Sequence, residues 1–301
     1  MTTLHNEHQH ASWVSGKLHR RSSEYSQPPP EYELNTLSPS TSTSTGSLPE
    51  YEHNADTGAF PSGSQARFYP SRTLQIEAAG HGICTLPYST SRQPIRVYEV
   101  MSGGDAIGDL VYESERIKRH SGDSILVRAG GSEAPICSTN YRFGPGRHPR
   151  MRLHGLRESE EVYEFSNKSL LSRAQVIRTH LGTFEWRYAS RKERKALGAN
   201  SLLVLEHVSK VALAGGGSED HRRKVAQLIR NDEYRSRGTS RMTAGNGGRL
   251  ELDLREWADT KGEAEQMEVL ALASCMVMLK KEVDRRRAGQ MAAMHSGGGG
   301  P

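Results

Sequence analysis

Hydrophobic residues follow a two-residue period over much of the second half of the chain. Phe184-Glu185-Trp186-Arg187-Tyr188 alternates apolar with charged residues, and so does Leu250-Glu251-Leu252-Asp253-Leu254. Clusters of Gly, Pro, Asn and Ser separate the runs, which is typical of antiparallel strands joined by turns. The predicted strands are Val97–Met101, Leu110–Tyr112, Ile125–Val127, Ile136–Phe143, Met151–His154, Val162–Phe165, Val176–Ile177, Phe184–Tyr188, Leu202–Leu205, Val211–Leu213, Val225–Ile229 and Leu250–Leu254.

One segment near the C-terminus has a different pattern. Glu263–Arg287 contains no Gly or Pro, and Met267–Leu279 is apolar apart from Glu268 and Ser274. As a helix those residues rise about 20 Å, which is short of the ~30 Å hydrocarbon layer of a bilayer. A helix that is apolar on all sides is usually buried in protein. A short membrane-inserted helix is the alternative.

Together these elements predict a mainly β fold. About twelve antiparallel strands would form a closed barrel wrapped around the C-terminal hydrophobic helix, because only an enclosing sheet buries such a helix on every side. Basic residues from Lys280 to Arg287 then close the helix where its dipole favours positive charge.

The N-terminal third differs in composition. Eight of the thirteen prolines precede residue 92, among Ser, Thr and His residues with few aliphatic side chains. Such a segment buries too little apolar surface to offset its conformational entropy. We therefore expect residues 1–92 to be a disordered tail, 93–288 to be the barrel with its helix at 263–287, and 289–301 to be a disordered Gly-rich tail.

Charge is distributed in the same way. Residues 1–92 carry 6 Lys and Arg against 8 Asp and Glu, whereas the remainder carries 34 against 27. A basic domain can contact phosphates of lipid or nucleic acid. Nucleic acid is not expected as a partner, because the sequence contains no zinc finger, no RNP-type aromatic pattern and no recognition-helix motif.

The three cysteines, Cys84, Cys137 and Cys275, are an odd number without CxxC spacing. This usage favours a reducing, cytoplasmic location over a disulfide framework or zinc site. Met1–His10 is not a secretory signal, and no apolar stretch is long enough for a transmembrane segment. Without a GxSxG, HExxH, P-loop or GxGxxG motif, the sequence predicts no enzyme, no cofactor and no metal site.

Two proline-tyrosine motifs lie in the tail. Pro29-Pro30-Glu31-Tyr32 is a PPxY sequence and Leu48-Pro49-Glu50-Tyr51 is the related LPxY. Proline favours the polyproline II conformation that WW domains bind in aromatic grooves, and two copies on one tether add avidity. The predicted partner is a WW-domain protein, such as a HECT ubiquitin ligase, contacted by Pro29, Pro30, Tyr32, Leu48, Pro49 and Tyr51. A chance match is the alternative.

Two basic clusters occur in the predicted barrel. Arg187, Arg191, Lys192, Arg194 and Lys195 lie in the hairpin after Trp186, and Arg222-Arg223-Lys224 lie before a strand. The first cluster is a candidate contact for anionic phospholipid headgroups, where each basic residue contributes about 1 kcal/mol. Solvated turns of the same composition are the alternative.

The final strand and helix carry a resemblance to a known family. Leu250–Leu254, a short acidic linker and Met267–Leu279 resemble the C-terminal end of the tubby-like superfamily, which includes tubby domains, phospholipid scramblases and LURP-one-related proteins. Phe184–Arg187 and the polar turn after it are similar to a tubby-like domain family of unknown function found in fungi. The resemblance covers roughly residues 93–288 and implies a twelve-stranded barrel around a central helix.

The resemblance also suggests what to test near the helix. Scramblases have a calcium-associated acidic stretch there, and Glu251, Asp253, Glu256 and Asp259 occupy that position. A strand followed by a helix N-terminus explains the same residues without calcium. The expected function is a non-enzymatic adaptor, cytoplasmic or peripheral at a membrane. A scramblase-like lipid-handling protein and a structural interaction domain are the alternatives.

Overall fold

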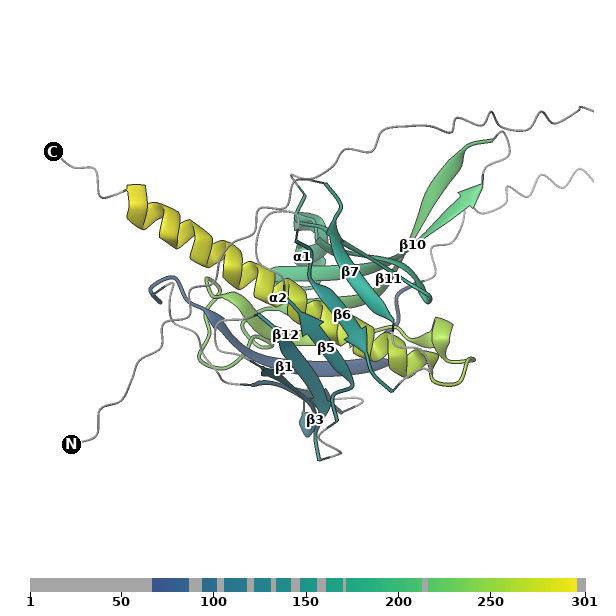
Figure 1. Cartoon of the computed structure of the whole chain (residues 1–301), viewed down its shortest axis with the longest axis horizontal. Helices are drawn as coiled ribbons and strands as arrows, with labels where there is room; N and C mark the ends of the chain where they lie inside the picture. The colour runs from purple at the N-terminus through teal and green to yellow at the C-terminus, as the bar shows by residue number, and fades with distance from the viewer. Residues whose placement is uncertain are drawn as a thin grey trace, which may run out of the picture. The chain divides into compact units, whose positions relative to one another are not determined.

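Twelve β-strands pair in sequence order into a closed antiparallel barrel, and a long helix, α2, runs through it (Figure 1). The computed structural model describes residues 67–86, 94–101, 106–117, 122–130, 134–141, 147–155, 161–169, 172–212 and 216–296. The strands are β1 (Arg72–His81), β2 (Ile95–Val100), β3 (Ile107–Arg116), β4 (Ser124–Arg128), β5 (Cys137–Asn140), β6 (Arg150–Leu153), β7 (Val162–Asn167), β8 (Gln175–Thr179), β9 (Gly182–Tyr188), β10 (Ser201–Ala212), β11 (Ser218–Arg230) and β12 (Ala244–Leu252).

Three helical segments accompany the strands. Helix α1 spans Arg191–Ala196, a 3-10 turn, η1, spans Arg255–Trp257, and α2 spans Glu263–Ser296. The barrel closes where β1 pairs with β12, in a register that runs from Arg72 opposite Leu252 to His81 opposite Ala244. The predicted fold class, a mainly β antiparallel barrel around a C-terminal helix, is confirmed.

The apolar part of α2 is enclosed by the sheet. Every residue from Gln266 to Leu279 is buried, and Leu272 is fully buried. The predicted burial of this helix on all sides is therefore confirmed. The alternative, a helix inserted in a membrane, does not fit a segment that the sheet encloses. Among the described residues, no helix combines the length and hydropathy needed to cross a membrane.

The two polar residues within the apolar stretch each have a partner on the barrel wall. Trp186 Nε1 donates to Ser274 Oγ at 2.8 Å, and Ser274 in turn donates to the Ala271 carbonyl. Tyr112 donates from its hydroxyl to Glu268 Oε1 at 3.0 Å. Because buried polar groups are costly when unpaired, these bonds favour one axial and rotational position of the helix.

Close backbone packing holds α2 against β12. A Cβ added to Gly245, which has a φ of 67°, would lie 2.5 Å from the Leu279 carbonyl oxygen. A Cβ on Gly247 would collide with the Ile76 carbonyl oxygen of the neighbouring β1. A larger residue at Gly245 would push the helix away from the sheet, and one at Gly247 would disrupt the pairing of β12 with β1, so both glycines permit the tight fit.

Three predicted boundaries are wrong. Strand β1 lies inside the predicted tail of residues 1–92, and α2 continues to Ser296, beyond 287 and into the predicted Gly-rich tail of 289–301. Val211–Leu213 is not a separate strand, since Val211 and Ala212 form the outer end of β10. The strand number agrees with the prediction only because the missed β1 replaces this extra strand.

The two ends of the barrel differ in which connections they carry. Consecutive strands are antiparallel neighbours, so connections alternate between ends. We call the end from which α2 emerges the exit end; it holds α1 and the connections that follow odd-numbered strands. The opposite end, where η1 and the start of α2 lie, is the entry end.

Candidate functional site

The exit end is strongly basic. The described residues of its connections, together with Lys280–Ser296, include 15 Lys and Arg against 6 Asp and Glu. The cations are Arg147, Lys168, Arg173, Arg191, Lys192, Arg194, Lys195, Arg235, Arg237, Arg241, Lys280, Lys281, Arg285, Arg286 and Arg287, and the acids are Asp123, Glu193, Asp232, Glu233, Glu282 and Asp284. This is an excess of nine positive charges.

The entry end has the opposite sign. Its described connections, with residues 67–71 and the start of α2 to Glu268, carry 3 Lys and Arg against 7 Asp and Glu. These are Arg67, Arg255 and Lys261 against Glu161, Asp253, Glu256, Asp259, Glu263, Glu265 and Glu268. The barrel is thus electrically polar along α2, and its exit end attracts anions.

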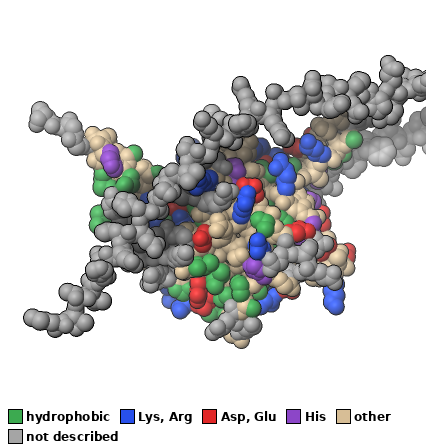
Figure 2. Space-filling view, viewed as in Figure 1, with side chains coloured by type: hydrophobic (Ala, Val, Ile, Leu, Met, Phe, Trp, Pro, Cys, Tyr) green, Lys and Arg blue, Asp and Glu red, His purple; other side chains and the backbone are tan. Residues whose placement is uncertain are grey.

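Helix α2 projects from the basic end. Val283 is its last buried residue, and the 13 residues from Asp284 to Ser296 rise a further distance of about 20 Å. Figure 2 shows hydrophobic side chains gathered on this projecting segment. Met294 is 49% exposed there.

A second segment is fixed beside the projecting helix. Gln290 donates from its side chain to the carbonyl oxygen of Ile83 at 2.8 Å, and its Oε1 is 2.8 Å from His81 Nε2. These contacts place the start of the β1–β2 connection, where Ile83 is 50% and Leu86 70% exposed, next to the helix. We call Ile83, Leu86 and Met294 the apolar tip of the exit end.

A buried ion pair locks α2 at the same end of the barrel. The Glu282 carboxylate accepts hydrogen bonds from Arg230 at 2.6 and 2.8 Å, from the Tyr188 hydroxyl at 2.9 Å and from the Gly245 N–H at 3.0 Å. Burial disfavours both charges, but the hydrogen bonds outweigh it, so the pKa of Glu282 is lowered and that of Arg230 is raised. The site's geometry depends on this lock.

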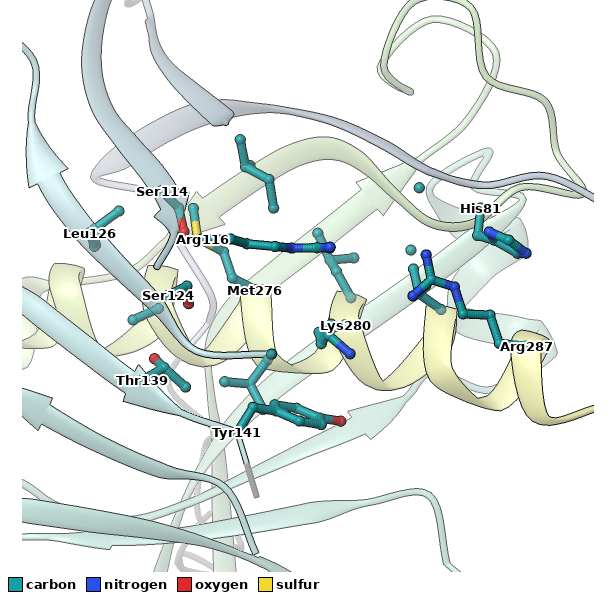
Figure 3. A pocket seen from close by; sticks show the side chains of 18 of the residues that line it. His81, Ser114, Arg116, Ser124, Leu126, Thr139, Tyr141, Met276, Lys280 and Arg287 are labelled. Carbon is teal, nitrogen blue, oxygen red and sulfur yellow. The ribbon is translucent and has the colours of Figure 1, made fainter. Parts of the chain in front are cut away.

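A cavity of about 170 Å³ opens at the exit end between α2 and the wall formed by β1 to β5 (Figure 3). Its lining includes inward-facing Ser114, Ser124 and Thr139 on three neighbouring strands. The far side of the barrel is filled by much larger residues: Phe165, Phe184, Trp186, Leu203, Leu205 and Leu228. The short hydroxyl side chains leave this space unfilled.

The mouth of the cavity is cationic. Arg116, Lys280 and Arg287 line it, and Lys280 pairs with Asp284 at 2.5 Å and lies over the ring of Tyr141. Burial lowers the pKa of Arg116, and the charge of Arg287 lowers it further. Burial also lowers the pKa of Lys280, against the opposing effect of Asp284. These shifts reflect cations held close together in a partly desolvated place.

A groove on the other side of α2 is also basic. Its lining includes Arg173 and Arg241 from the connections and Arg285 and Arg286 from the helix. Lys281, beside them on α2, donates to Gln175 Oε1, and burial lowers its pKa to about 8. Cations therefore surround the emerging helix on both sides.

The predicted lipid-contact residues lie at this exit end, in the β9–β10 hairpin as predicted, but the connection of that hairpin contains a short helix. Arg191, Lys192, Arg194 and Lys195 are in α1, which begins with a capping box in which Ser190 accepts from the Glu193 N–H. Arg187 is engaged within the barrel wall, since its guanidinium pairs with Glu193 at 2.8 Å and also with Glu206. Arg191, Lys192 and Lys195 are exposed.

The second basic cluster is part of the wall. Arg222 and Arg223 lie inside β11 and not before it, and Arg222 bridges Glu185 and Glu206. Arg223 pairs with Glu256 and lies 5.4 Å from the Trp257 ring centroid. These arginines stabilise the wall and the entry end, so they are poor candidates for a ligand contact.

The acidic stretch before α2 is occupied by protein partners. Asp253 accepts from Arg255 and from the Tyr69 N–H, Glu251 accepts from Gln227, and Glu256 pairs with Arg223. Asp259 is exposed. The structure thus favours the strand and helix-start interpretation. Among the described residues, no three His, Cys, Asp or Glu side chains are grouped to hold a metal ion.

Two further expectations concern the WW-ligand motifs and the cysteines. The WW-ligand residues Pro29, Pro30, Tyr32, Leu48, Pro49 and Tyr51 lie outside the described residues. The three cysteines are free thiols, with Cys84 exposed in the β1–β2 connection and Cys137 and Cys275 buried.

Sequence reasoning missed the residues that build the cavity mouth. Arg116 ends β3, whereas Lys280 and Arg287 belong to α2, and no local spacing connects them. The one available signal was the run of cations after the apolar helix, which the dipole alone explains. Comparison with known proteins finds no match to this chain among family models, curated proteins or solved structures.

Proposed function

We propose that this protein is a non-enzymatic adaptor that docks on anionic membranes through the exit end of its barrel. The observation that carries the proposal is the charge polarity along α2: the described residues have an excess of nine positive charges at the exit end and of four negative charges at the entry end. Near an anionic bilayer each basic residue contributes about 1 kcal/mol. The same field turns the acidic entry end away from the surface.

The apolar tip supports the same orientation. Ile83, Leu86 and Met294 project from the basic end, and full burial of each aliphatic side chain would contribute about 1.5 to 3 kcal/mol. Apolar side chains on a basic element are the usual composition of a segment that lies in the membrane interface. Charge and hydrophobicity together therefore favour a lipid surface over an acidic protein.

The tail supplies the adaptor half of the proposal. Tyr32 and Tyr51 belong to two WW-ligand motifs in one chain with the barrel, so a membrane-docked barrel would recruit a WW-domain protein, such as a HECT ubiquitin ligase, to that surface. A cytoplasmic location and membership of the tubby-like superfamily are parts of this proposal. The closed barrel around a central helix is the fold that the resemblance implies.

The test is co-sedimentation of the full-length protein with vesicles of phosphatidylcholine, with and without phosphatidylserine. The variant Lys192→Glu plus Lys195→Glu should lower binding to the anionic vesicles at least tenfold, since two attractive charges become repulsive. The variant Ile83→Glu plus Met294→Glu should lower it to a similar degree by removing apolar contact.

Matched controls exist at other sites. Lys210→Glu plus Lys261→Glu changes the net charge by the same amount on exposed residues away from the exit end. Ile107→Glu plus Val211→Glu does the same for exposed apolar residues. Docking by the exit end is refuted if the control pairs weaken binding as much as the test pairs, or if phosphatidylserine has no effect.

A further inference from the structure

We propose that the cavity between α2 and strands β1 to β5 is a binding site for a small anionic amphiphile. Its anionic group would lie at the cationic mouth, and its apolar group, of about six carbon atoms, would lie inside. This inference concerns a soluble or lipid-derived small molecule and does not depend on membrane docking.

The size of the cavity sets the apolar group. A dry protein cavity of about 150 Å³ binds benzene, and this cavity measures about 170 Å³. It therefore accommodates one six-carbon ring with a short link to a polar group. A full-length acyl chain does not fit, so a lipid could insert only a short part of a chain.

The walls of the cavity differ along its length. The inner part is formed by Leu126 of β4 and by Ala273, Met276 and Val277 of α2. Lys280 follows one helical turn after Met276, and Arg287 follows two turns later on the same face. One face of α2 thus changes from apolar to basic toward the exit end, which matches the two halves of an amphiphile.

The charge at the mouth selects an anion. Arg116, Lys280 and Arg287 supply three positive charges at the mouth. Among the described residues the nearby acids are Asp284, which pairs with Lys280, and Asp123, which accepts from the Tyr141 N–H. In Figure 3 the head groups of the three cations point toward a common region beside the helix. Arg116 and Arg287 also have other partners. An anion is attracted by the summed charge of the mouth and does not require an unpaired guanidinium.

Hydroxyl groups add specificity to the part of the wall near Leu126 and Met276. Ser114, Ser124 and Thr139 point into the cavity from β3, β4 and β5 (Figure 3). Hydroxyls can donate to an oxyanion, whereas they gain nothing from a purely apolar ligand. A carboxylate or phosphate attached to a small ring or chain is therefore the class of ligand that satisfies every part of the lining.

Three probes of nearly equal size test this inference: phenylacetate, 2-phenylethanol and 2-phenylethylamine, titrated into the full-length protein by calorimetry. Phenylacetate should bind at least about tenfold tighter than the alcohol, because one partly desolvated charge interaction contributes that much, and the amine should bind weakest. The proposal fails if none of the three binds at millimolar concentration, as for a water-filled void, or if all bind equally.

Variants locate the binding. Arg287→Gln should weaken phenylacetate binding severalfold, whereas Arg286→Gln, the neighbouring arginine that lines the groove on the other side of α2, should not. Ala273→Leu should abolish binding by filling the cavity. Equal effects of the two arginine variants, or an Ala273→Leu protein that melts normally and still binds, would overturn the assignment.

A competition experiment distinguishes two sources of a natural ligand, a lipid and a free organic acid. Monomeric dihexanoyl phosphatidylserine, which has both the anionic group and short chains, either displaces phenylacetate or does not. Displacement assigns the site to a lipid whose chain end and headgroup enter it, and lack of displacement assigns it to free organic acids. Loss of vesicle binding with retained phenylacetate binding would refute membrane docking alone.

Discussion

Replacing Glu282 by methionine should destabilise the protein far more than replacing the whole ion pair. In Glu282→Met the Arg230 guanidinium, whose side chain is 5% exposed, loses both short hydrogen bonds to the carboxylate. Asn246 at 3.3 Å and Ser201 at 2.8 Å remain as neutral acceptors. Removing one partner of a buried pair costs about 3 to 5 kcal/mol, because the other charge stays buried without a counterion.

The double variant Arg230→Met plus Glu282→Met removes both charges and keeps similar side-chain volumes. Hydrophobic replacements of buried ion pairs are often close to neutral. The free energy of unfolding of the double variant should therefore lie within about 2 kcal/mol of the wild-type value. The Tyr188 hydroxyl and the Gly245 N–H also lose their acceptor when Glu282 is replaced, in the single and in the double variant. These two unpaired donors account for the destabilisation that we expect of the double variant.

Urea unfolding followed by tryptophan fluorescence measures these free energies, since Trp186 contacts α2 through Ser274. In a thermal melt the single variant should lose about 6 to 20 °C, at roughly 2 to 4 °C per kcal/mol for a domain of this size. The single variant Arg230→Met completes the comparison. If the losses of unfolding free energy in Arg230→Met and Glu282→Met simply add in the double variant, the pair does not lock the helix and this reasoning is wrong.

Further predictions address the helix, the pH dependence and the tail. Leu272→Asp should abolish soluble expression and Leu272→Ala should cost about 2 to 5 kcal/mol in urea unfolding, whereas Val211→Asp on the exposed end of β10 should be near neutral. Burial lowers the pKa of Lys281 from 10.5 to about 8, so the unfolded chain binds more protons between these values and the folded state should gain stability as pH rises from 8 toward 10. Lys281→Met should remove this gain, which we expect to be about 1 kcal/mol after allowance for solvent screening, measured as the difference from wild type at each pH. Tyr32→Ala plus Tyr51→Ala should abolish pull-down by a tandem WW array and each single variant should only weaken it; retention by the double variant would disprove the ligand assignment.

Period-two patterning was sufficient to predict most of the wall because the inward positions of a barrel strand are apolar. It failed for β1 although Leu74, Ile76 and Ala78 alternate with Gln75 and Glu77. The composition of the whole N-terminal third concealed this short run. Pairing with β12, which no local signal reveals, is what makes these residues a strand.

The end of α2 was misplaced for a related reason. Gly289 suggests a stop, but good helix formers surround it, and Gln290 gains hydrogen bonds from the distant residues His81 and Ile83. The α1 capping box at Ser190 and Glu193 follows the S-x-x-E pattern that marks the start of a helix. The cavity was not predictable, since it arises from the contrast between small and large residues on strands far apart in the chain.

Closure of the barrel between its first and last strands has a consequence for biosynthesis. Strand β1 leaves the ribosome before the other strands, yet its partner β12 and the filling of the barrel, α2, are translated after all of them. Until then the nascent sheet has an open edge and an uncovered concave apolar face, so the barrel cannot close before α2 is made, and we expect folding to be slow for its size. A chain truncated before Glu263 would have a sheet with nothing to close around, and quality control should degrade it.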